Sequence, residues 1–146
     1  MVVHPLGNFI QQRRSAQFTS RVRAALAELG LQASNFGPRL HRLFHEVCLK
    51  CHTEERVNAN PYSLAIEFFL RMMIEYPHIA SGAVMFQGAL IESVGVLRSW
   101  HVRGRIEGER ARASIEQIKR HLVEQLKSLD LSDEARLETE LQVREL

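Results

Sequence analysis

The spacing of apolar residues along this chain is that of α-helices. Phe18, Val22, Ala25 and Leu29 recur at three- and four-residue steps. Such steps place side chains on one face of a helix. No stretch alternates convincingly between apolar and polar residues, and no Asn-Gly pair marks a β-hairpin. The pattern therefore predicts an all-α fold.

Turn-forming residues divide this pattern into separate helices. Gly30 follows the first apolar stretch, where a glycine commonly ends a helix. Pro38 and Pro61 suit the first turn of a helix, and Pro77 disfavours helical geometry in the residue before it. We expect helices over approximately these residues: 8–30, 38–56, 61–76, 81–103, 105–130 and 132–144.

Short connections between these segments favour antiparallel neighbours. The expected architecture is a single helical domain, residues 1–146, that forms an antiparallel bundle of five or six helices. The segment 61–76 is apolar on nearly all sides, and it includes Phe68, Phe69 and Met72. A helix of that kind is buried, so we expect it at the centre of the bundle.

The segment 105–130 holds the clearest candidate for self-association. Its apolar residues lie on or beside an a/d-like stripe of the heptad repeat: Ile115, Ile118, Leu122, Leu126 and Leu129. Fewer than three clean heptads do not make a coiled coil, but they suffice for an antiparallel or dimeric pair of helices. The stripe therefore predicts a contact between two copies of the chain.

The segment 81–103 offers a second candidate contact. Ser81, Gly88 and Gly95 are spaced seven residues apart, and a glycine inside a helix costs about 1 kcal/mol relative to alanine. Two glycines on one side predict that another helix approaches closely there, and the alternative is a locally weak helix. Trp100 near the end of this segment is a candidate interface anchor if it is exposed.

The charge of the chain is small but unevenly distributed. The formal net charge is +2, whereas residues 1–56 carry eight basic and four acidic side chains. Arg14 and Arg21 share a face of the first helix, with Arg13 nearby. Such a face can contact phosphates, which makes a nucleic-acid accessory protein one alternative function. No helix-turn-helix signature or aromatic stacking pattern accompanies these arginines.

One segment concentrates histidine and cysteine. At about 100° per residue, His41, His45, Cys48 and His52 fall within about 60° of one another on a helix. Cys51 lies closer to the apolar face. Two such side chains four residues apart can chelate a transition ion such as zinc. All four cannot reach one ion, because eleven residues of helix span about 16 Å.

Cys48, Cys51 and His52 also match the Cys-x-x-Cys-His step of covalent haem attachment. The competing interpretation is that both cysteines are small buried hydrophobic residues and that the histidines lie at the boundary of the core. On balance we expect no cofactor. A metal- or haem-binding sensor remains the second alternative function.

The sequence contains no catalytic constellation that we could identify. It has neither a Gly-rich phosphate loop nor a nucleophile elbow. The composition, with 45% hydrophobic and 25% charged residues, is typical of globular domains. Without an apolar run long enough for a membrane span or a leader, we expect a cytoplasmic protein. These observations favour a non-enzymatic helical interaction or regulatory protein that forms a homodimer.

Overall fold

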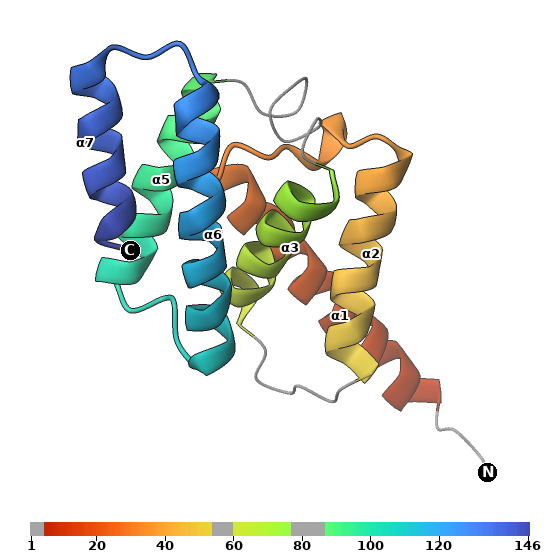
Figure 1. The fold of residues 1–146 in the computed structure, drawn as a ribbon. Helices are drawn as coiled ribbons and strands as arrows, with labels where there is room; N and C mark the ends of the chain where they lie inside the picture. The colour runs from red at the N-terminus through yellow and green to blue at the C-terminus, as the bar shows by residue number, and fades with distance from the viewer. Residues whose placement is uncertain (1–4, 54–59, 77–86) are drawn as a thin grey trace.

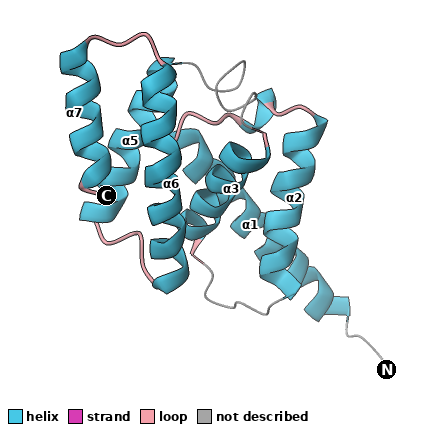
Figure 2. Ribbon diagram, viewed as in Figure 1, coloured by secondary structure: helices cyan, strands magenta, loops and turns pink. Residues whose placement is uncertain are grey.

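The computed structural model is helical throughout the parts of the chain that it describes (Figures 1 and 2). It describes residues 5–53, 60–76 and 87–146, and of residues 5–15, 49–53 and 87–90 it describes the backbone alone. Within these ranges there are six α-helices and one short 3₁₀-helix, and no strand. The predicted all-α bundle of five or six helices is therefore confirmed for the described residues. The α-helices are α1 (Pro5–Glu28), α2 (Pro38–Thr53), α3 (Pro61–Glu75), α5 (Gln87–Val102), α6 (Glu109–Ser128) and α7 (Asp133–Arg144).

Helix α3 lies at the centre, as its composition predicts. Eight of its residues are buried, from Leu64 through Met73. It packs against α1, α2 and α6 (Figure 1). The rings of Phe36, Phe44 and Phe68 join the loop before α2, α2 itself and α3, with centroids 5.3 Å apart for the stacked pair Phe36–Phe68. Aromatic pairs in this arrangement add to the stabilisation from buried area.

Helices α5, α6 and α7 run in alternating directions beside this centre (Figure 1). Helix α6 contacts both α3 and α7, and α7 also contacts α5. The hydroxyl of Ser93 on α5 donates a hydrogen bond to the carbonyl of Leu29, 2.5 Å away. This bond supplies a partner for a buried carbonyl just beyond the end of α1, where the helix leaves carbonyl groups without intrahelical donors.

The polar ends of the helices follow the expected capping chemistry. The side chain of Asn60 accepts a hydrogen bond from the backbone N–H of Tyr62, and Pro61 opens α3. The side chain of Ser132 accepts from the N–H of Ala135 at the start of α7. Each cap satisfies a backbone donor that has no intrahelical acceptor.

The connection between α5 and α6 differs from the expected one. A helix was expected from residue 105, but α6 begins at Glu109. Gly104 and Gly108 adopt positive φ angles of 69° and 90°, a region that favours glycine. The intervening Arg105 stacks over the ring of Tyr62 and donates a hydrogen bond of 2.7 Å to its hydroxyl. This connection is therefore a defined loop held against the start of α3.

None of the described helices is long and apolar enough to cross a membrane.

The burial pattern predicts a large difference between two leucine substitutions. Leu122 on α6 has no exposed surface, whereas the side chain of Leu137 on α7 is 59% exposed. Leu122→Ala removes fully buried methyl groups and is expected to lower the free energy of unfolding by about 2–5 kcal/mol. Leu137→Ala is expected to change it by less than about 0.5 kcal/mol. Urea denaturation of both variants measures this difference, and equal losses would contradict the packing described here.

Candidate functional site

The histidine- and cysteine-rich segment lies on α2, but its side chains occupy different environments. His41 and His45 are exposed, and Cys48 is buried. The ring of His41 meets the edge of Phe36, with centroids 5.8 Å apart. Cys51 and His52 belong to α2, but their side chains lie outside the described part of the chain. The predicted stripe is therefore divided between solvent and core at its described positions.

Among the described side chains, no group of three or more His, Cys, Asp or Glu residues is arranged to hold a metal ion. His41 and His45 alone supply two ligands, and a closed zinc site needs four. Both the zinc and the haem interpretations involve Cys51 or His52, so they remain predictions. Elemental analysis of the purified protein, before and after incubation with zinc, would decide between them and the absence of a cofactor.

The basic face of the first helix is only partly described. Arg13 and Arg14 lie in α1, with side chains outside the described set, and Arg21 is exposed. On the opposite flank of α1, Arg23 places its guanidinium 5.3 Å from the centroid of the Phe44 ring. This cation–π contact gives Arg23 a structural role between α1 and α2. The nucleic-acid interpretation of the other arginines stays a prediction.

The stripe that was expected to form a dimer contact lies inside the chain. Its members Ile115, Ile118, Leu122 and Leu126 are at most 3% exposed, and Leu129 packs against the core. The physical reason is that the apolar side chains of α3 must be shielded from water. Helix α6 shields them together with α1 and α2. While the chain keeps this fold, these side chains are not available to a second copy.

Trp100 does not meet the condition for an interface anchor, because it is not exposed. Trp100 is 1% exposed, and its ring meets the ring of Tyr62 edge-on with centroids 4.8 Å apart. It therefore anchors α5 against the start of α3 within the same chain. Among the described residues, no helix approaches Gly95 closely, because an added Cβ there would meet none of their atoms within 4 Å. The side-chain environment of Gly88 lies outside the described residues.

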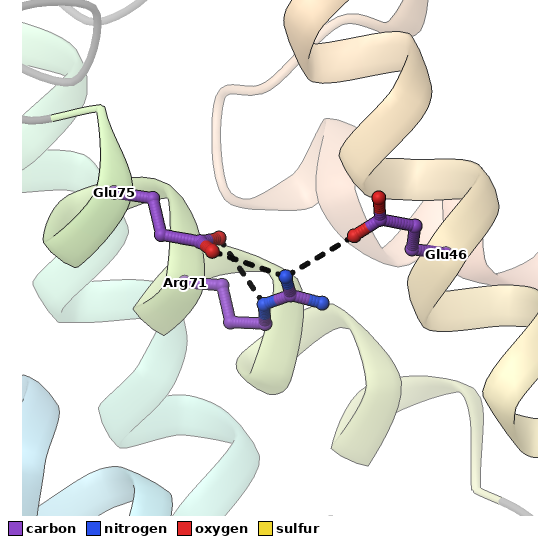
Figure 3. Close-up of polar contacts among 3 residues, drawn as sticks. All are labelled: Glu46, Arg71 and Glu75. Carbon is purple, nitrogen blue, oxygen red and sulfur yellow. Dashed lines mark hydrogen bonds and ion pairs between the residues drawn. The ribbon is translucent and has the colours of Figure 1, made fainter.

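A charged cluster joins α2 to α3 (Figure 3). Arg71 on α3 forms ion pairs of 3.2 Å with Glu46 on α2 and 3.1 Å with Glu75, one turn along α3. Burial lowers the pKa of Arg71, but hydrogen bonds and charge interactions with Glu75 and Glu46 outweigh it and raise the pKa above its ordinary value. The two carboxylates neutralise the charge of Arg71, and the pair with Glu46 links α2 to α3.

The outer face of α7 is the most conspicuous apolar feature of the described surface. Leu137 and Leu141 lie one helical turn apart and are 59% and 49% exposed. They are flanked by exposed Glu134 on the N-terminal side and exposed Arg144 on the C-terminal side. We call these four residues the outer face of α7. The other large apolar side chains that are strongly exposed, Ile74 and Val102, belong to α3 and α5.

The sequence predicts a last helix over residues 132–144 but does not tell which of its faces is packed. The structure turns Thr139 and Val143 toward the core, with Leu146 buried just beyond the helix, and leaves Leu137 and Leu141 exposed. The signal that could have revealed this is that α7 has apolar residues on two opposite faces. Only one of them can be covered by a single neighbouring layer.

In comparisons with protein-family models, curated proteins and solved structures, nothing matches this chain. The function is therefore inferred from the surfaces of the molecule itself.

The ion pairs of Arg71 predict a small stabilisation. Because this side chain is about one third exposed, solvent screens its charge, and Arg71→Gln is expected to lower the free energy of unfolding by about 0.5–1 kcal/mol. The loss should shrink in about 1 M NaCl, where charges are screened over a few ångströms. The matched control is Arg112→Gln, which removes an exposed charge on α6. A loss that is independent of salt would contradict an electrostatic role.

Proposed function

We propose that this chain is a non-enzymatic helical interaction protein that forms a homodimer through the outer face of α7. The observation that carries this proposal is the exposure of Leu137 and Leu141, 59% and 49%, on adjacent turns of one helix. Isolated apolar side chains are common on protein surfaces, whereas a contiguous apolar patch indicates a contact site. An amphipathic helix presents such residues to a partner helix at i and i+4.

A second copy of the chain is the partner that fits this face best. The two leucines lie between an acidic residue at one end, Glu134, and a basic residue at the other, Arg144. When two copies of such a face meet in antiparallel orientation, the acidic end of each copy lies beside the basic end of the other. Isologous contacts of this kind, in which one patch meets itself, are the commonest arrangement in soluble homodimers.

The expected association is weak and depends on concentration. Each half-exposed leucine can bury roughly half of its side chain, which contributes about 1 kcal/mol per residue. The contact is small, because it contains four such side chains per dimer and surface ion pairs that each contribute little. The proposal is therefore a reversible dimer, assembled at high local concentration, rather than a permanent one.

The two alternative functions have less support in the described residues. A sensor of metal or haem would need ligands beyond the exposed pair His41 and His45. A nucleic-acid accessory role would depend on Arg13, Arg14 and Arg21, of which the last alone has a described side chain. We place the protein in the cytoplasm, where the thiols of Cys48 and Cys51 stay reduced.

Replacing both leucines of the outer face by glutamate is expected to abolish the dimer. The double variant Leu137→Glu and Leu141→Glu puts like charges into the contact and removes its apolar area, and because both positions are exposed the fold should persist. Sedimentation equilibrium between about 10 µM and 1 mM covers association free energies of about 4–7 kcal/mol. Wild-type protein should show a rising dimer fraction over this range, and the variant should stay monomeric.

The matched control is Ile74→Glu on α3, a site with 48% exposure that lies outside the outer face of α7. It should associate as the wild type does. Wild-type protein that remains monomeric at about 1 mM would reject the proposed function, because even a free energy near 4 kcal/mol would give detectable dimer there.

A further inference from the structure

We infer that the two copies pair through antiparallel α7 helices, with Leu137 of each copy on Leu141 of the other and Glu134 of each copy beside Arg144 of the other. This inference depends on the proposed function, since it specifies the geometry of the same contact. It assigns a role to charges on the outer face of α7 as well as to its leucines.

The register follows from the spacing of the face. Leu137 and Leu141 lie two residues on either side of position 139, and Glu134 and Arg144 lie five residues on either side of it. A two-fold axis that passes position 139 therefore exchanges the members of each pair. With a rise of about 1.5 Å per residue, the charged ends lie about 15 Å apart along the helix, so each end of the contact receives one acidic and one basic side chain.

All four side chains can take part at once. At about 100° per residue, Glu134, Leu137, Leu141 and Arg144 fall within an arc of about 80°. The structure exposes each of them and turns Thr139 and Val143 to the opposite, buried side. A stripe of that width is what one helix presents to another in a pairwise contact.

The charges at the two ends are available for this purpose. Among the described residues, Glu134 and Arg144 have no ion-pair partner. Their neighbours are engaged: Glu145 pairs with Arg98 of α5 at 2.5 Å, and Asp133 lies 4.0 Å from Arg136. A parallel arrangement would place Glu134 against its own copy and Arg144 against its own copy. Like charges at both ends disfavour it, so the antiparallel arrangement is selected.

The same symmetry also predicts unfavourable contacts, of which the one at Glu138 is the more exposed. Glu138 is exposed and lies one residue from the two-fold axis, at the edge of the outer face. A residue next to such an axis meets its own copy, so two carboxylates approach each other there. Removing this charge should therefore strengthen the dimer, which is an effect that few surface substitutions have.

A charge-exchange experiment tests the register. Glu134→Arg and Arg144→Glu each replace two attractive contacts per dimer by two repulsive ones, and each is expected to raise the dissociation constant roughly five- to tenfold. The double variant exchanges the charges and should return to within about twofold of wild type. Glu138→Gln should lower the dissociation constant by roughly twofold or more. Arg120→Glu, an exposed charge reversal on α6, is the control and should change little.

The outcomes separate this inference from the proposed function. If Leu137→Glu with Leu141→Glu abolishes association but the single charge reversals leave it unchanged, or the double variant stays as weak as the singles, the outer face of α7 is the contact and the antiparallel register is wrong. If the wild-type protein is monomeric throughout, both proposals fall together. Circular dichroism of each variant should match the wild type, since all the substituted positions are exposed.

Discussion

The burial of α3 is the constraint on which the rest of this structure depends. A helix that is apolar on nearly every side is stable only when it is buried, and eight residues of α3 are buried. Covering it requires several neighbours, and α1, α2 and α6 each supply one apolar stripe. The stripe of α6 is therefore used within the chain. The apolar face of α6, which the sequence suggests as a contact for a partner, packs against the core of its own chain.

This assignment of faces determines what remains for the surface. Helix α5 is tied to the core by a hydrogen bond from Ser93, by the packing of Trp100 on Tyr62 and by the ion pair of Arg98 with Glu145. Among the described helices, α7 packs on α5 and α6. Its buried residues are Thr139 and Val143, and Leu137 and Leu141 are left exposed. The outer face of α7 is thus a consequence of the layer order of the bundle.

The sequence predicted the helical class, the central position of α3 and the helix starts at Pro38 and Pro61, because these depend on local spacing and local backbone geometry. It could not predict which apolar stripe meets another part of the same chain and which meets a partner, since the same spacing serves both. Trp100 and Leu122 were misjudged for this reason. The burial of Leu137 and Leu141 could not be predicted either, because a helix with two apolar faces gives no local sign of which one is covered. The stripe of His41, His45 and Cys48 shared an angle on the helix, yet its members differ in burial, which is set by neighbouring helices.

The central claim is that the leucines of α6 are internal and those of α7 form the contact between copies. Methyl NMR spectra recorded over a range of protein concentrations test both halves of it at once. We expect the methyl signals of Leu137 and Leu141 to shift as the protein concentration rises, while those of Leu122 and Leu126 stay constant. Concentration-dependent shifts at Leu122 and Leu126, with constant signals at Leu137 and Leu141, would contradict it.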